Sequence, residues 1–182
     1  MTAIDGRVQR GTRNREAIVD ALLACYEAGE LRPSVPEVAA RAGVSARSVH
    51  NHFADVEALR AEVSQRQWER YAPLLGEVAT IEALVANRVS FFEAVTPVRR
   101  AALLSIHDSR TIARNLARLD HLLRRQLEAV FPGADRDVLD ALELATSWDA
   151  WNRLRSAQGC SVARARRLVE RTIRCLTEGK SS

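Results

Sequence analysis

The stretch AARAGVSARSVHNHF, residues 39–53, places a single glycine between two short runs that both favour helix. Gly43 can adopt the left-handed backbone conformation that ends a helix, because glycine has no Cβ to clash. Ser45 follows two residues later, and its side-chain oxygen can cap the start of a new helix. The sequence therefore predicts two short helices that meet at a steep angle, which is a helix-turn-helix.

Apolar residues at helical spacing predict a small hydrophobic seam that fixes this angle, made by Val38, Ala39, Ala42, Val44, Val49 and Phe53. Two short helices cannot bury the seam alone, so an earlier helix must cover it through Ile18, Leu22 and Tyr26. The outward face then carries Ala46, Arg47, His50 and Asn51. A braced helix with such a polar face is the arrangement that enters a DNA major groove. A helical corner within an all-α enzyme or scaffold is the alternative.

Helical periodicity extends along nearly the whole chain, and no segment shows a convincing strand pattern. Glycine, proline and capping residues predict breaks at residues 29–33, 43–45, 54–55, 73–76, 97, 132–133 and 159–161. We therefore expect an all-α protein of about nine helices. Ser34 and Glu37 form a capping-box pattern, and the expected caps of later helices are Asp55, Thr80, Asp108, Asp135 and Ser161.

Composition predicts a folded cytoplasmic protein with no membrane association. The 182 residues are 47% hydrophobic, enough for a sizeable core. No apolar run approaches the roughly 18 residues of a membrane span, and the N-terminus lacks the apolar middle of a secretory signal. Cys25, Cys160 and Cys175 form no CxxC pair, so we expect buried, reduced thiols and neither a metal site nor a cofactor.

The net charge of +4 permits an anionic partner, but residues 1–73 hold ten arginines and ten acidic residues. DNA binding there depends on where the charges lie. Arg7, Arg10, Arg13 and Arg15 form a basic N-terminal arm, for which solvated charge is the alternative interpretation.

Residues 15–59, from REAIVDALL to ADVEAL, resemble the DNA-binding domain of the TetR family of transcriptional regulators. The landmarks in register are Ala21 and Tyr26 before Gly29, Val35 and Ala39 before AGVS at 42–45, His52 with Phe53, and EAL at 57–59. The stretch SWDAWNRLRSAQGCSVARA, residues 147–165, is similar to the last two helices of many members. Three residues depart from the family pattern: His50 replaces a tyrosine that commonly contacts phosphate, Val56 replaces a frequent lysine, and Pro36 takes a place often held by a polar residue.

The resemblance implies a DNA-binding domain with a basic arm at residues 1–57 and a helical ligand-binding and dimerisation domain at 58–182. It implies a homodimeric repressor that binds a palindromic operator and is released by a small-molecule effector. The competing hypothesis is an all-α ligand-binding protein or enzyme whose helix-turn-helix no longer binds DNA. No catalytic serine-histidine-acid or paired-carboxylate pattern stands out, so we expect a protein that is not an enzyme.

Arg47 is the best candidate for base readout, because a guanidinium can donate two hydrogen bonds to guanine. Asn51 is suited to adenine or phosphate, and His50 to phosphate. Hydroxyls near helix starts suit phosphate oxygens, although serines there also serve purely as caps. The full predicted DNA-binding set is Ser34, Ser45, Ala46, Arg47, Ser48, His50, Asn51 and His52.

The C-terminal region offers weaker candidates. Arg88 falls on an apolar stripe, so it either reaches the edge of the helical bundle or awaits an acidic ligand. The candidate effector-binding residues are Arg88, Phe92, His107 and Trp148. The apolar faces expected to form the dimer interface comprise Val138, Leu142, Ala145 and Trp148 on one helix, and Leu168, Val169, Thr172 and Leu176 on the next.

Overall fold

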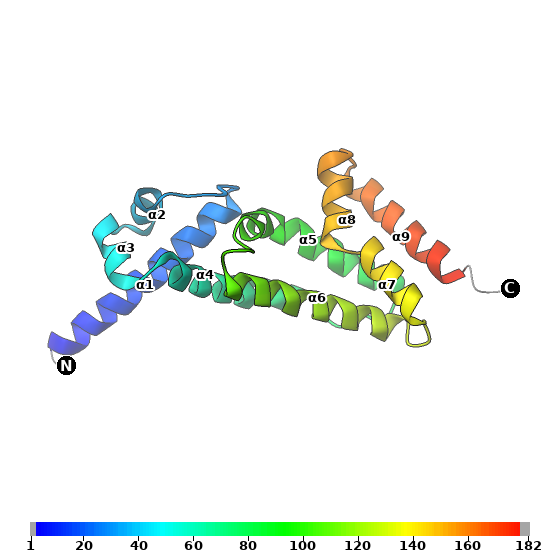
Figure 1. The fold of residues 1–182 in the computed structure, drawn as a ribbon, viewed down its shortest axis with the longest axis horizontal. Helices are drawn as coiled ribbons and strands as arrows, with labels where there is room; N and C mark the ends of the chain where they lie inside the picture. Colours follow the sequence, from blue (N-terminus) through cyan, green and yellow to red (C-terminus); the bar gives the residue numbers. More distant parts are fainter. Residues whose placement is uncertain (1–2, 179–182) are drawn as a thin grey trace. The chain divides into compact units, whose positions relative to one another are not determined.

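The computed structural model describes residues 3–178, which form nine α-helices and no strand (Figure 1). The predicted all-α class is confirmed. The helices are α1 (Ala3–Glu27), α2 (Val35–Ala42), α3 (Ala46–His52), α4 (Val56–Tyr71), α5 (Ile81–Leu103), α6 (Arg110–Val130), α7 (Arg136–Ala145), α8 (Trp148–Asn152) and α9 (Val162–Glu178). A 3₁₀ turn, Ala72–Leu74, follows α4, and a π-helical turn, Arg153–Ala157, follows α8.

Packing divides the chain into two compact units. The first unit comprises Met1–Ala72 with Pro97–Leu116, and the second comprises Pro73–Thr96 with Ala117–Ser182. Both α5 and α6 contribute to each unit. The predicted division into a DNA-binding domain, residues 1–57, and a ligand-binding and dimerisation domain, residues 58–182, is a division by function. It stays a prediction.

The ends of the short N-terminal helices follow the predicted chemistry. The Ser34 amide donates to Glu37 Oε2 at 2.7 Å while the Glu37 amide donates back to Ser34 Oγ at 3.4 Å, which completes the capping box. Gly43 ends α2 with a left-handed φ of 67°, and Ser45 Oγ accepts from the Ser48 amide at 3.1 Å to start α3. Asp55 caps α4 through the Ala58 amide at 2.7 Å.

The arginines predicted to form the basic N-terminal arm lie on α1, and their contact with DNA stays a prediction. Two local expectations were wrong. Pro97 does not end α5, because Phe92 before it and Val98 after it are both buried and hold the helix on either side of the missing amide donor. Asp108 does not cap α6, since the buried Ser109 hydroxyl accepts from the Ile112 amide instead, at 3.2 Å.

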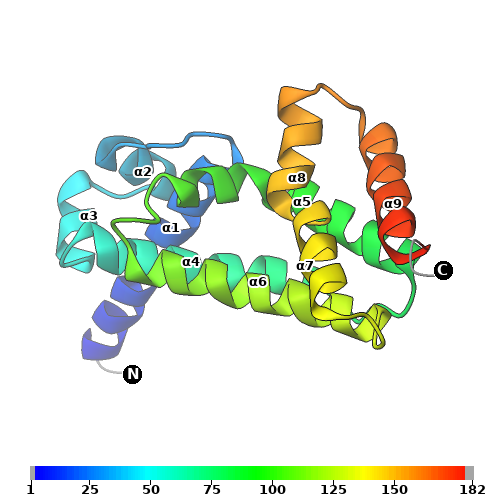
Figure 2. The same ribbon diagram turned by 45° about the vertical axis from the view of Figure 1, so that its right-hand side comes forward.

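The core of the first unit is the predicted seam. The residues Ile18, Leu22, Val38, Ala39, Val49 and Phe53 all belong to one buried cluster, with Tyr26, Ala42 and Val44 packed against it. Figure 2 shows α2 and α3 lying beside α1, the helix that covers them. The guanidinium of Arg15 lies 4.3 Å above the Phe53 ring and also pairs with Glu62 on α4. These contacts tie α1, the end of α3 and α4 together.

The second unit is built around a separate set of buried side chains, which includes Leu84, Phe92, Leu127, Leu142, Trp151 and Ile173. Helices α7 and α9 pack against each other in this unit. Cys25 and Cys160 are buried as predicted, whereas the expectation for Cys175 was wrong because it lies exposed on α9.

Candidate nucleic-acid interface

Three polar side chains share the exposed face of α3. Arg47, His50 and Asn51 are all exposed, and their spacing of three and four residues places them on one side of the helix. None of the three forms a hydrogen bond or ion pair with the residues that the structure describes. Their donors and acceptors are therefore free for an external partner.

The other predicted residues of α3 lie closer to the core. Ala46 packs against the buried cluster, and Ser48 and His52 are half-buried. The His52 carbonyl accepts a hydrogen bond from the Arg15 guanidinium. Ala46 and His52 thus help to hold α3 in place, whereas the trio of Arg47, His50 and Asn51 stays exposed for an external partner.

The two capping serines differ in what surrounds them. The Ser34 hydroxyl donates to Glu37 Oε2 at 2.6 Å, and the hydrogen bonds from Ser34 lower the pKa of the Glu37 carboxyl. A carboxylate that stays charged at neutral pH repels a phosphate, so Ser34 is poorly suited to phosphate binding. Ser45 is exposed and uses its oxygen only as an acceptor for α3, which leaves its hydroxyl proton available.

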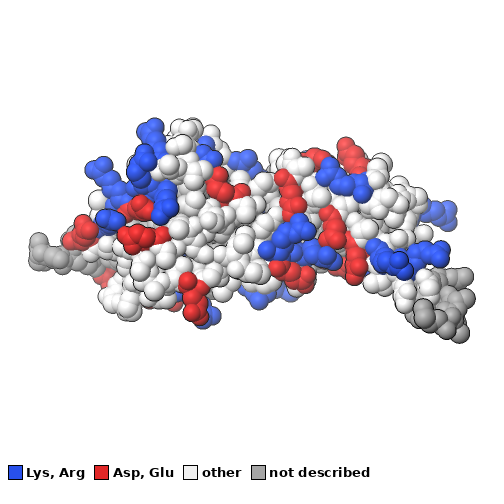
Figure 3. Space-filling view, turned by 180° about the vertical axis from the view of Figure 1, so that it is seen from behind, with Lys and Arg blue, Asp and Glu red and all other residues white. Residues whose placement is uncertain are grey.

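Five acidic side chains of the first unit are paired with arginine. The pairs are Arg15–Glu62, Arg41–Glu30 at 3.0 Å, Arg66–Asp20 at 3.0 Å, Arg66–Glu69 at 4.0 Å and Arg70–Glu27 at 2.6 Å. Figure 3 shows positive and negative side chains interspersed on the face in view. Three exposed arginines have no ion-pair partner among the side chains that the structure describes: Arg10, Arg13 and Arg47. The side chain of Arg7 lies outside the described side chains. The start of α1 and α3 are thus among the parts of the first unit that carry arginines without an ion-pair partner.

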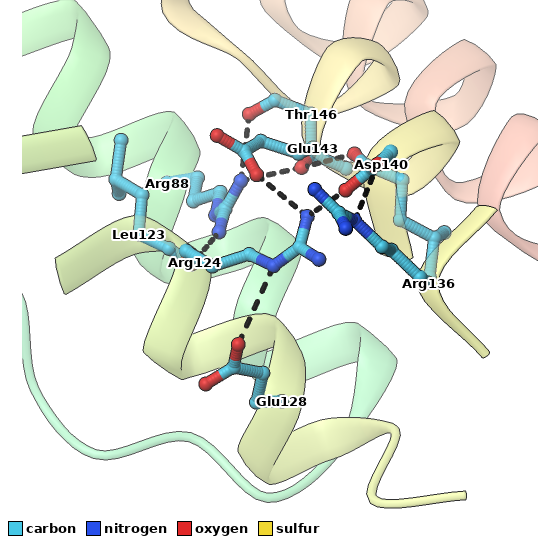
Figure 4. A network of polar contacts seen from close by, with 9 residues as sticks. Arg88, Leu123, Arg124, Glu128, Arg136, Asp140, Glu143 and Thr146 are labelled. Carbon is cyan, nitrogen blue, oxygen red and sulfur yellow. Dashed lines mark hydrogen bonds and ion pairs between the residues drawn. The ribbon is translucent and has the colours of Figure 1, made fainter. Parts of the chain in front are cut away.

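In the second unit, Arg88 is buried, with only 4% of its surface exposed. Its guanidinium donates to the Leu123 carbonyl at 2.5 Å, to the Thr146 carbonyl at 2.9 Å and to the Thr146 hydroxyl (Figure 4). Burial lowers the pKa of Arg88 to about 10, so it remains charged near neutral pH. The expectation that Arg88 reaches the edge of the bundle was wrong, because carbonyls from α6 and the end of α7 bind its two terminal nitrogens inside, while its buried Nε has no partner among the described residues.

An ion-pair network joins α6 to α7 close to Arg88 (Figure 4). Arg124 contacts Asp140 at 2.6 Å and Glu143 at 2.7 Å from its Nη1, and Glu128 at 3.4 Å from its Nε. Glu143 also raises the pKa of Arg88 against the larger effect of burial. The two arginines therefore hold the same pair of helices, one from inside and one from the surface.

The predicted effector-binding residues do not converge on one site. Arg88 and Phe92 line a cavity of about 10 Å³ with Trp151 and Val169, which has room for about one water molecule. Trp148 is buried, and its indole nitrogen donates to Thr96 Oγ1 at 3.0 Å. His107 is exposed and belongs to the first unit.

The predicted dimer faces are partly used inside the chain. Leu142, Trp148 and Val169 are buried, so these three residues are not available to a partner. Leu168 of the predicted face on α9 is 36% exposed. Leu144 on α7, which was not in the predicted face, is 74% exposed. The sequence interpretation missed Leu144 because the stripe through Leu142 and Ala145 lies on the neighbouring side of the same helix.

The fold is similar to that of a solved protein. A candidate TetR-family transcriptional regulator from Mesorhizobium loti MAFF303099 matches with a TM-score of 0.65 and 16% sequence identity, over 93% of this chain and 98% of that one. No family model matches the sequence, and no curated protein matches it. This chain thus has the fold of a TetR-family regulator, with a helix-turn-helix followed by a helical region. The resemblance in the sequence is confirmed at the level of the fold.

Two kinds of feature are absent from the residues that the structure describes. No helix within residues 3–178 is long and apolar enough to cross a membrane. In the same residues, no cluster of three or more histidine, cysteine or acidic side chains is arranged to hold a metal ion.

Proposed function

We propose that this protein is a sequence-specific DNA-binding transcriptional regulator. The observation that carries the proposal is the exposed trio of Arg47, His50 and Asn51, which has no partner among the described residues and stands on a helix braced by α1 and α2. A short helix held in this way can enter the major groove with its polar face toward the base edges. Arg47 supplies base readout, while Ser45 and the arginines at the start of α1 supply phosphate contacts.

The regulator acts as a homodimer on a palindromic operator, in the cytoplasm. One α3 helix per subunit reads one half-site, and two subunits combine their phosphate contacts, which compensates for the balanced charge of residues 1–73. The exposed Leu144 and Leu168 are the apolar residues best placed to face the second subunit. Repression with release by a small-molecule effector is the mode that the TetR fold supports best.

Arg47→Ala should weaken binding to the preferred site by about 1–3 kcal/mol, as expected for the loss of a bidentate contact to a base. It should also flatten the preference at one base position per half-site. Fluorescence anisotropy with the preferred site and its single-base variants measures both effects. Equal weakening on every DNA sequence would assign Arg47 to a phosphate.

Val56→Lys should add a phosphate contact, because Val56 is 58% exposed in the first turn of α4, directly after α3. The slope of log affinity against log salt should steepen by roughly 0.9 per added contact, equally on preferred and random DNA. Ala163→Lys is the matched control, since Ala163 is exposed in the first turn of α9. If both variants behave alike, residue 56 does not face DNA.

A further inference from the structure

A cavity of about 470 Å³ lies within the first unit, behind the recognition helix α3. Its walls come from α1, the turn before α2, the inner sides of α2 and α3, the start of α4, and the segment 104–108 between α5 and α6. The volume falls within the range of about 300–1,000 Å³ that is typical of small-molecule sites. None of the predicted effector-binding residues lines it.

The cavity has an aliphatic interior and an aliphatic rim. The buried part of its wall is formed by four residues that are each no more than 8% exposed: Leu22, Val38, Val49 and Leu59. Three of the large apolar side chains that the chain leaves exposed surround the same space: Leu31 at 42%, Val56 at 58% and Leu104 at 45%. Exposed apolar residues gathered around one cavity indicate a surface that a ligand covers.

Two polar residues without side-chain partners of their own line the cavity. Tyr26 and Arg60 are both half-buried, and neither side chain forms a hydrogen bond or ion pair with any described residue. They lie near enough that the charge of Arg60 acts on the pKa of Tyr26, which burial raises. Both also line an adjoining cavity of about 20 Å³, together with Ser105.

We propose that this cavity binds a small amphipathic monocarboxylate with an aliphatic body. The carboxylate accepts hydrogen bonds from Arg60 and Tyr26, and the aliphatic body covers Leu31 and Leu104. A half-buried guanidinium gains most from a carboxylate, because hydrogen bonds between charged groups are shorter and stronger than neutral ones. The proposal does not depend on DNA binding, since the site is defined by contacts within the first unit.

The charges at the mouth favour a single negative charge on the ligand. Arg32 and Asp108 both line the cavity and both are exposed, so they largely offset each other and are screened by water. Among the described charged residues that line the cavity, Arg60 is half-buried, and one carboxylate neutralises it. A second carboxylate would meet Asp108 with no further half-buried cation to offset it.

Isothermal titration of the full chain with octanoate and with 1-octanol tests the proposal, because these probes share the aliphatic body and differ in charge. We expect saturable binding of one octanoate per chain in the millimolar range or tighter. Arg60→Gln should weaken octanoate by about 10-fold or more and change octanol binding by less than about twofold. Arg114→Gln is the matched control, since Arg114 is exposed on α6, lies outside the cavity and has no described partner; it should change neither.

Leu104→Trp should weaken both probes, because the larger ring narrows the mouth of the cavity. Circular dichroism checks that each variant is folded. If Arg60→Gln unfolds, Tyr26→Phe takes its place, and we expect this variant to lose affinity for octanoate but not for octanol. The proposal is overturned if octanoate shows no saturable binding, or if the folded Arg60 or Tyr26 variant retains wild-type affinity for octanoate. Unchanged octanoate binding by folded Leu104→Trp also overturns it, because the probe then binds elsewhere.

Discussion

Phe53→Ala is expected to lower the free energy of unfolding by about 3–5 kcal/mol, the usual cost of deleting a buried aromatic ring. Phe53 is only 4% exposed and closes the end of α3 within the core of the first unit. The substitution also removes the ring beneath Arg15, which ties α1 to the end of α3 and to α4. The loss therefore includes both a cavity and a cation–π contact.

Chemical denaturation followed by circular dichroism measures this loss. Phe131→Ala is a matched control, because it deletes the same ring from a half-buried position just after α6. The control should lose clearly less stability than Phe53→Ala. A loss below about 1 kcal/mol for Phe53→Ala would contradict the packing of α3 described above.

Arg88→Ala is expected to lower the free energy of unfolding by about 3 kcal/mol, which combines an unsatisfied carbonyl with a cavity. The Thr146 carbonyl at the end of α7 depends on Arg88, whereas the Leu123 carbonyl lies within α6. Removal of the guanidinium therefore leaves the Thr146 carbonyl without the donor that the structure gives it.

Arg88→Met separates the two contributions to this loss. Methionine fills much of the space but donates no hydrogen bond, so the expected loss is about 1–2 kcal/mol. Thermal or chemical denaturation of the two variants side by side measures the difference. If both variants retain wild-type stability, Arg88 does not hold the end of α7.

The helix-turn-helix was predictable because its determinants are local. Gly43 and Ser45 fix the turn through backbone conformation and one capping bond, both of which depend on residues within three positions. The buried seam through Val49 and Phe53 follows from helical spacing alone. The exposed face with Arg47, His50 and Asn51 is then the remaining side of the same helix.

The features that sequence reasoning missed depend on distant partners. The donation of Arg88 to the carbonyls of Leu123 and Thr146 joins residues 35 and 58 positions away. Continuation of α5 through Pro97 depends on buried residues on both sides of the proline. The 470 Å³ cavity draws Tyr26, Arg60 and Leu104 from three separate helices and turns, and no periodic pattern records such a juxtaposition.

Selection of binding sites from a random double-stranded DNA library tests whether α3 of this protein reads DNA. We expect enrichment of a palindromic motif with half-sites about one helical turn apart, bound by two chains. Its affinity should fall steeply with added salt and should exceed that for scrambled DNA by at least about 10³-fold. If no sequence is enriched above the input library while the protein remains folded, α3 does not read DNA and the proposed function is wrong.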